Sequence, residues 1–351
     1  MEPVTHFLTG ACIGRAGFNR TTGYATLMMT LAAEFPDIDM LWGIKGPVEE
    51  LAHHRGLTHS FIGAPLDSAI VLAIVYGVHV WRKRRGKAPP LAPRWGLLFL
   101  FGILATLSHI LLDFTNNYGV RPFLPFSWRW YSWDIIFIIE PILLLALFLG
   151  LVLPSIFSLV GGEIGARKEK FRGRWCAVCA LVAVLAMWWI RDYEHRKVVT
   201  LLNSTDYRGE VVIKAAAMPY PLNPFVWEGI VQTQSFYAKI PVDLRASSLD
   251  LQNRPMMVLY KPAETAITLS AKKSRLGRVY LDWSRFPLVD TEPPSAPDQD
   301  YDVHFRDLRF DYSPINFGEQ NPRRTPLSAD VFVNHRGEVV LMKMGDREER
   351  P

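Results

Sequence analysis

The stretch HHRGLTHSFIGAPLDSAIVLAIVYGVHVWRKRR, residues 53–85, contains the features that decide the fold of this chain. Three histidines and an arginine come first, an apolar run follows from Phe61 to Trp81, and basic residues close it. The apolar run has the roughly 20 residues that an α-helix needs to cross a bilayer. The stretch therefore predicts a membrane-spanning helix with a polar group at one end and positive charge at the other.

The rest of the first half of the chain has the same character. Three more apolar runs are candidates for spanning helices: Trp95 to Asp113, Ile135 to Val160, and Trp175 to Ile190. Two shorter runs, Val4 to Ile13 and Tyr24 to Phe35, predict a helical hairpin that enters the bilayer and returns, which is tolerated when other helices cover it. We expect residues 1–192 to form an α-helical multi-pass bundle of about four spanning helices plus this hairpin.

Basic residues set the expected orientation. They follow the first span and precede the last one, at Arg82, Lys83, Arg84, Arg85 and Lys87, and at Arg167, Lys168, Lys170, Arg172 and Arg174. Such clusters mark cytoplasmic loops. They also account for the net charge of +5 without a nucleic-acid partner, because no basic stripe with interleaved aromatic residues is present. The N-terminus has no pattern of a removable signal peptide.

Residues 193–351 form the second expected domain, which this orientation places outside the cytoplasm. Short β-branched, aromatic or alternating stretches are separated by Gly, Pro and Asn. The predicted strands lie within Glu210 to Ala215, Trp227 to Ile240, Met256 to Tyr260, Arg278 to Trp283, and Ala329 to Val333. This pattern favours a mostly antiparallel β domain.

Polar residues of the first half gather at one predicted depth, on the outer side. They are His6, Asp37, Asp39, His53, His54, His59, His109, Asp113, Asp134 and Glu140. Ionisable groups are costly in a membrane and usually face one another, a cavity or an ion. Histidines together with carboxylates suit zinc, with manganese or iron as alternatives.

The spacing of His109 and Asp113 is the most specific part of this set. Residues four apart lie on one face of a helix, so one turn can supply two metal ligands, or a ligand and the carboxylate that orients it. A buried His–Asp hydrogen bond without a metal is the alternative. The expected presence of His59 and Asp39 at the same depth favours the metal.

The segment HRGLTHS divides into different expected roles. His54 and His59 are candidate ligands, whereas Thr58 and Ser60 can cap the helix that follows. Arg55 has the planar fork of donors that binds a phosphate or carboxylate, so we expect it to hold a substrate anion.

The acids of FPDID follow Pro36, which should end the preceding helix. Asp37 and Asp39 then lie on a short loop, where one of them can bridge two metals or act as general base. A simple interfacial turn is the alternative. Asp67, Asp134 and Glu140 are weaker candidates for supporting positions.

The order of these motifs resembles the YdjM-like family of inner-membrane, metal-dependent hydrolases. The resemblance rests on TH (Thr5-His6), PDID (Pro36 to Asp39), HRGLTHS (His54 to Ser60), H-x-L-L-D (His109 to Asp113) and N-x-x-G (Asn116 to Gly119). The Trp133-Asp134 pair also fits, and the resemblance covers roughly residues 1 to 160 together with the last apolar run, Trp175 to Ile190. It implies a distant similarity to zinc-dependent phospholipase C and P1-type nucleases.

The resemblance implies a divalent metal, zinc above all, held by His6, His54, His59, His109 and Asp113, with Asp37 or Asp39 as ligand or base. It implies hydrolysis of a phosphoester or lipid-like substrate by metal-activated water at the outer face of the inner membrane. Membrane lipid is then the expected partner. The alternative is a non-catalytic, metal-binding or structural membrane protein whose β domain binds a partner.

Overall fold

The computed structural model describes residues 1–163, 173–220, 223–246, 251, 256–292, 294, 299–311 and 325–351. The chain divides into two compact units. The first, here the membrane unit, comprises Met1–Asp39, Arg55–His195 and Pro219–Pro224; the second, here the β unit, comprises Met40–His54, Arg196–Met218 and Phe225–Pro351. The segment Met40–His54 thus belongs to the β unit although both of its sequence neighbours belong to the membrane unit.

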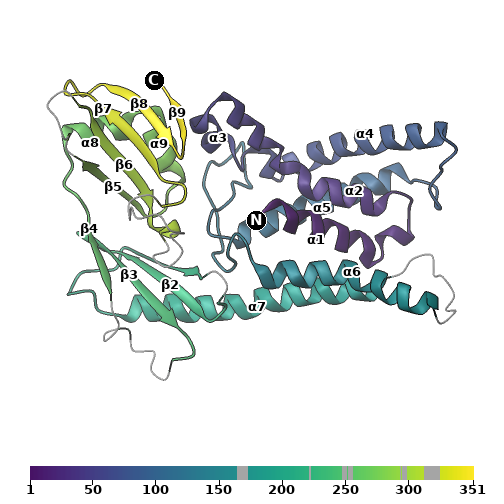
Figure 1. The fold of residues 1–351 in the computed structure, drawn as a ribbon. Coiled ribbons are helices and arrows are strands. Elements are labelled where there is room, and N and C mark those ends of the chain that lie inside the picture. Colours follow the sequence, from purple (N-terminus) through teal and green to yellow (C-terminus); the bar gives the residue numbers. More distant parts are fainter. Residues whose placement is uncertain are drawn as a thin grey trace. The chain divides into compact units, whose positions relative to one another are not determined.

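The membrane unit is a bundle of helices (Figure 1). Its longer helices are α1 (Pro3–Ala16), α2 (Ala25–Glu34), α4 (Gly63–Arg84), α5 (Trp95–Thr115), α6 (Pro141–Glu163) and the first part of α7 (Arg174–Ser204). Helices α1 and α2 form the expected hairpin and pack against each other, and α2 and α4 both pack against α5. A Cβ atom at Gly10 would come within 2.5 Å of the Met29 carbonyl oxygen, so glycine is required where α1 crosses α2.

Among the described residues, three helices are long and apolar enough to cross a membrane: Gly63–Arg84, Trp95–Thr115 and Arg174–Ser204. The fourth expected span, from Ile135 to Val160, is not confirmed. Ile135 and Ile136 donate backbone hydrogen bonds to the Thr115 carbonyl oxygen, so the helix begins only at Pro141. Its described apolar part, Pro141–Phe157, is shorter than the three spans. The basic residues expected at 167–172 lie outside the described residues.

The length of α5 places its polar residues near one membrane boundary. Trp95 begins the helix. At 1.5 Å per residue, Asp113 lies about 27 Å along the axis from Trp95, close to the thickness of about 30 Å of the hydrocarbon core. His109 and Asp113 therefore lie at the end of α5 that is remote from the basic loop joining α4 to α5.

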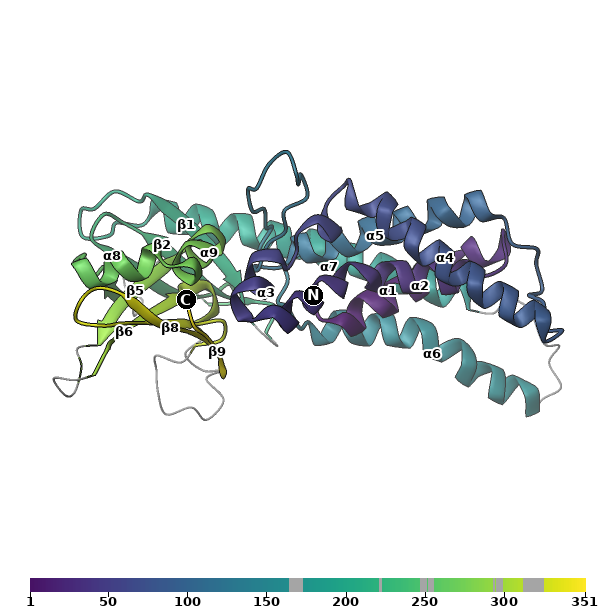
Figure 2. The same ribbon diagram turned by 90° about the horizontal axis from the view of Figure 1, so that it is seen from above.

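The β unit contains two sheets, seen from above in Figure 2. The first has the order β1 (Lys214–Pro219), β2 (Val226–Gln232), β3 (Phe236–Asp243) and β4 (Met257–Tyr260). The second has the order β5 (Pro287–Glu292), β6 (Tyr301–Asp307), β7 (Ala329–Val333), β8 (Val339–Met344) and β9 (Arg347–Glu349). The pairings from β2 to β4 and from β5 to β9 are antiparallel, as predicted. The last turns of α7 contribute Val198 and Leu202 to the core beneath the first sheet.

One predicted strand is wrong and another is displaced along the chain. The displaced strand, predicted from Glu210 to Ala215, overlaps β1 (Lys214–Pro219) only at Lys214 and Ala215. Arg278 to Trp283 lies in a helix, α9 (Arg275–Trp283), which follows α8 (Ala266–Lys273). The Ser274 side chain accepts a hydrogen bond from the Gly277 backbone N–H and caps α9. Leu276, Tyr280 and Trp283 are all buried, and their spacing of four and then three residues is helical. The aromatic content that suggested a strand is therefore the buried stripe of a helix.

The segment Met40–His54 contains a third helix of the β unit, α3 (Pro47–His53). It packs against α9, β8 and β9. Glu49 forms an ion pair with Arg275, and the Glu50 carboxylate lies 2.6 Å from Arg347 Nη1. Val48 and Leu51 are buried. These contacts explain why the segment belongs to the β unit.

Candidate metal centre

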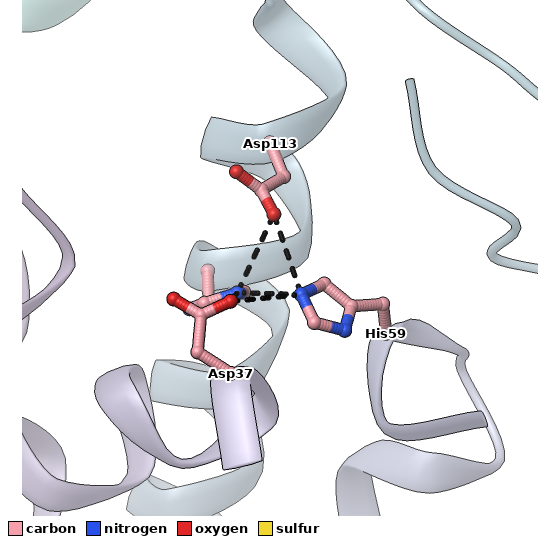
Figure 3. Close-up of side chains that lie close together, drawn as sticks. Asp37, His59 and Asp113 are labelled. Carbon is pink, nitrogen blue, oxygen red and sulfur yellow. Dashed lines mark hydrogen bonds and ion pairs between the residues drawn. The ribbon is translucent and has the colours of Figure 1, made fainter. Parts of the chain in front are cut away.

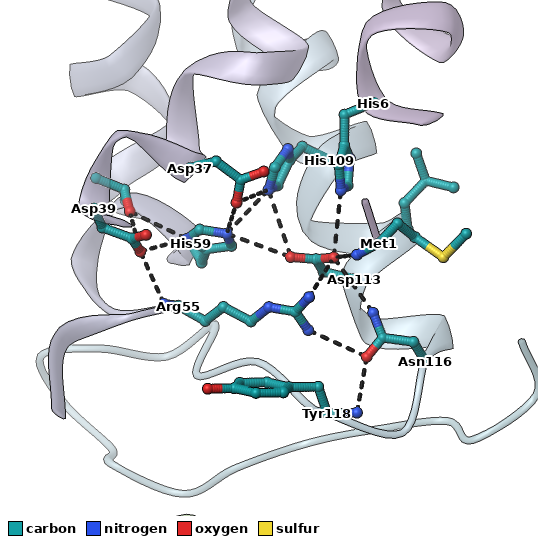
Figure 4. A network of polar contacts seen from close by, with 12 residues as sticks. Met1, His6, Asp37, Asp39, Arg55, His59, His109, Asp113, Asn116 and Tyr118 are labelled. Carbon is teal, nitrogen blue, oxygen red and sulfur yellow. Dashed lines mark hydrogen bonds and ion pairs between the residues drawn. The ribbon is translucent and has the colours of Figure 1, made fainter. Parts of the chain in front are cut away.

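Four side chains of the membrane unit converge on one point: Asp37, His59, His109 and Asp113. Figure 3 labels Asp37, His59 and Asp113, and Figure 4 labels all four. Each offers one ligand atom, and these four atoms all lie within 4.8 Å of one another. We call these four residues the His–Asp group. His109 and Asp113 lie four residues apart on α5, as the sequence predicts. Asp37 lies on the 3-10 segment η2 (Phe35–Lys45), and His59 ends η3 (Leu57–His59).

The distances within the group match those between the ligands of a zinc ion. The Nε2 atoms of His59 and His109 are 3.0 Å apart, and Asp113 Oδ2 lies 3.3 Å and 3.5 Å from them. Asp37 Oδ1 lies 3.4 Å and 3.6 Å from the same two nitrogens. A tetrahedral zinc ion with bonds of 2.0–2.1 Å separates its ligand atoms by about 3.3 Å. The residues present therefore fit a small divalent ion.

Both histidines of the group are held by their remote nitrogen. His109 Nδ1 is 2.7 Å from the Ala33 carbonyl oxygen. His59 Nδ1 is 3.1 Å from Asp39 Oδ2 and 3.1 Å from Thr58 Oγ1. Metal-binding histidines commonly have such a partner, which fixes the tautomer and directs the other nitrogen at the metal. Asp39 therefore orients His59 and is not itself part of the group.

The two oxygens of Asp113 have different surroundings (Figure 4). Oδ1 lies 2.9 Å from Arg55 Nη2, contacts the amino group of Met1, and is 3.4 Å from Asn116 Nδ2. Oδ2 is buried, accepts no hydrogen bond of ordinary geometry from the described residues, and faces His59 and His109. An unsatisfied carboxylate oxygen beside two imidazole nitrogens makes a candidate binding position for a cation.

Asp37 and His59 carry opposite charges at neutral pH when no metal is bound. Burial by itself would raise the pKa of Asp37, but the hydrogen bond to His59 and the charge of His109 hold this pKa well below its usual range. Burial would lower the pKa of His59, whereas the neighbouring carboxylates of Asp113, Asp37 and Asp39 raise it to about 10. The histidine is thus protonated at neutral pH when no metal replaces its proton.

Two of the other predicted site residues, His6 and Arg55, contact the group. The remaining ones do not belong to it: His54, Asp67, Asp134 and Glu140. His6 is fully buried, stacks on His109 with ring centroids 3.7 Å apart, and has its Nε2 atom 3.4 Å from Asp113 Oδ1, yet it lies outside the His–Asp group. Arg55 is also buried and contacts Asp113. The structure does not bring His54 into the group, because His54 follows α3 in the β unit. Asp67, Asp134 and Glu140 are buried without belonging to the group.

Several contributors were not predicted as site residues, and one of them is the amino group of Met1, which contacts Asp113 Oδ1. Asn116 and Tyr118 contact Arg55, and the Ala33 carbonyl oxygen holds His109. The N-x-x-G motif was a signal for Asn116. The Ala33 carbonyl oxygen is a backbone atom 76 positions away from His109. Because every residue has such a carbonyl, the sequence could not predict this contact.

The helices and the buried His–Asp group define a multi-pass membrane protein with a candidate metal site. Residues 1–195 match the profile of the YdjM inner membrane protein family, and the chain belongs to this family. The chain is also similar to the Uncharacterized protein YfhP of Bacillus subtilis (strain 168), with 26% identity over 161 residues, which are 42% of this chain and 44% of that protein. No solved structure matches the chain. The expected similarity to zinc-dependent phospholipase C and P1 nuclease is not shown by these comparisons.

Proposed function

We propose that this protein is a metal-dependent hydrolase of the inner membrane that acts on an amphiphilic ester, such as a phosphoester of a lipid. The observation that carries the proposal is the geometry of the His–Asp group. Its two imidazole nitrogens and two carboxylate oxygens lie within 4.8 Å of one another, and every distance within the group that involves a nitrogen is 3.0–3.6 Å. A bound divalent ion lowers the pKa of water from near 16 to about 7 and polarises the oxygen of an ester.

In this proposal His59, His109 and Asp113 hold the ion, and Asp37 accepts the proton from the attacking water. A catalytic site keeps one position open for water or substrate, so three protein ligands suffice. Asp37 is the most accessible member of the group, with a side chain that is 13% exposed whereas the other three are 0% exposed. Its place at the open edge suits a base.

Apolar side chains beside the group support an amphiphilic substrate. Ile38, next to Asp37, is 44% exposed, and Leu57 and Phe61, on either side of His59, are 50% and 51% exposed. Exposed apolar residues at the end of spanning helices suit contact with lipid tails. A substrate with an ester at its polar end would then reach the group from the bilayer surface.

A second candidate is a structural metal site in a non-catalytic membrane protein. Its supporting observation is that four protein ligand atoms lie within 4.8 Å of one another, because structural zinc sites are closed by four protein ligands. The substitution Asp37→Asn separates the two. If Asp37 is the base, the variant should retain the metal while turnover falls by about 100-fold or more. As a fourth ligand, its loss weakens metal binding.

The test uses the full chain in detergent. Metal content is measured by elemental analysis, and hydrolysis is measured on phospholipids, soluble phosphodiesters and carboxylesters. Metal bound without turnover on any of these substrates would contradict the hydrolase and favour the structural site. Asp134→Asn, which removes a buried carboxylate outside the group, is the matched control and should change neither property.

A further inference from the structure

Arg55 is held at both its backbone and its side chain. The Arg55 backbone N–H donates to Asp39 Oδ2 at 2.8 Å, and Nη2 lies 2.9 Å from Asp113 Oδ1. Nη1 donates to Asn116 Oδ1 at 3.1 Å and to the Gly119 carbonyl oxygen at 3.0 Å. Arg55 thereby connects the carboxylate that orients His59 with a carboxylate that belongs to the His–Asp group.

The conformation of Arg55 has an energetic cost. Its φ of 54° is in the left-handed region, which costs a residue with a side chain about 1–2 kcal/mol. Such conformations persist where the surroundings determine them, and they cluster at functional sites. The Arg55 guanidinium carbon also lies 4.6 Å from the centre of the Tyr118 ring. The guanidinium is therefore fixed in place, and its contacts to Asp113 and Asn116 would have to break before it could bind a substrate anion.

The position of this guanidinium bears on how many ions the centre holds. In two-metal sites the ions lie about 3.5–4 Å apart and share bridging ligands. A bridging Asp113 would offer Oδ2 to one ion and Oδ1 to the other. Arg55 already occupies Oδ1 with a permanent positive charge, which would repel a second divalent ion there.

We infer that the centre binds a single divalent ion, and that Arg55 takes the place of a second cation by binding Asp113 Oδ1 and directing Oδ2 at the ion. Arg55 is then a positioning residue. His6 stacks on His109, and its Nε2 atom lies 3.4 Å from Oδ1, the oxygen that Arg55 occupies. Both ring nitrogens of His6 are buried without a hydrogen-bond partner among the described residues, so the single ion expected here makes His6 a neighbour of the centre and not a ligand of a second ion. The inference rests on the metal centre of the proposed function and does not depend on hydrolysis.

The experiment counts ions and measures their affinity in the full chain, purified in detergent and equilibrated with Zn²⁺ or Co²⁺. Arg55→Met removes the charge but retains the length of the side chain, and Arg55→Lys restores the charge. Arg121→Met is the matched control, because Arg121 is 3% exposed and its guanidinium carbon lies 4.3 Å from the centre of the Trp130 ring in the same unit. Elemental analysis gives the number of ions, chelator competition gives the affinity, and the Co²⁺ absorption spectrum reports the ligand geometry.

We expect one ion per chain for the wild type, Arg55→Lys and Arg121→Met. Arg55→Met should lower the affinity by about 10–100-fold and alter the Co²⁺ spectrum, as loss of a residue that orients a ligand does. Arg55→Lys should recover most of the affinity.

Two results would overturn the inference. One is two ions per wild-type chain. The other is wild-type metal affinity in Arg55→Met together with weaker inhibition by inorganic phosphate, which would assign Arg55 to a substrate anion. If Arg55→Met does not fold, two other results test the inference. The wild-type stoichiometry tests whether the centre binds one ion, and the Co²⁺ spectrum of Arg55→Lys tests whether residue 55 sets the ligand geometry. One ion with the expected Arg55 series but no hydrolysis would contradict the proposed function and leave this inference standing.

Discussion

Each unit of this protein contains a buried Arg–Asp pair, and the two pairs differ in what the aspartate leaves unsatisfied. In the β unit, Asp307 Oδ2 accepts hydrogen bonds from Ser284 Oγ at 2.6 Å and the Arg285 backbone N–H at 2.7 Å. The Arg309 side chain and backbone bind both Asp307 oxygens. The Asp307 carboxylate is therefore satisfied entirely by its own unit.

In the membrane unit, Arg55 binds only one oxygen of Asp113, and the other oxygen faces two histidines. Both arginines are buried, and both lie against aromatic rings, Tyr118 for Arg55 and Trp283 for Arg309. Burial and an arginine partner are thus common to a structural pair and a candidate metal centre. The unsatisfied oxygen is what distinguishes them.

The largest expected effect is on the structural pair. Asp307→Asn removes the charge that Arg309 needs in a fully buried position, and breaking such a pair costs about 3–5 kcal/mol. Hydrogen exchange of the β6 amides in the full chain should report this loss, with metal affinity unchanged. Unchanged exchange of those amides would show that the pair does not stabilise the β unit.

Asp113→Asn makes the corresponding change at the candidate metal centre. It removes a ligand, so metal affinity should fall by about 100-fold or more, beyond the range found for residues that only orient ligands. Chelator competition measures this, and Asp307→Asn is the matched control. Equal metal affinity in the two variants would contradict the comparison.

Asp39→Asn tests the orienting role assigned to Asp39. The change weakens the partner of His59 Nδ1 and leaves all four members of the His–Asp group in place. Metal affinity should fall by about 10–100-fold with one ion still bound per chain. A complete loss of metal would instead make Asp39 a ligand.

The smallest effect is that of pH on metal uptake. The pKa of His59 without metal is raised to about 10, so the stabilisation from its protonated form is complete below the ordinary value near 6.5 and is lost as pH rises through 10. Metal must displace this proton, so affinity should increase by up to about tenfold per pH unit below pH 10. Calorimetry in buffers of different ionisation enthalpy should detect about one proton released per ion at pH 7. Metal uptake without proton release would contradict the ion-paired state of His59.

Much of the membrane unit could be predicted from periodicity and charge. Apolar runs identified the three spans, and the spacing of His109 and Asp113 placed both on one face of α5 because a helix repeats every 3.6 residues. The β unit was less predictable. The residues from Arg278 to Trp283 are apolar or aromatic at positions that suit a strand or a helix, and only packing against the second sheet and the cap at Ser274 selects the helix.

The sequence by itself determined that the ionisable residues lie at one end of the membrane helices, since hydropathy and basic loops are properties of the chain. Only the tertiary structure decided which of them meet. It placed Asp37 in the group, Asp39 behind His59, and His54 in the other unit. It also turned Arg55 toward Asp113. These outcomes depend on how segments far apart in the chain pack. That packing alone decides which oxygen of Asp113 faces the two histidines and which one binds Arg55.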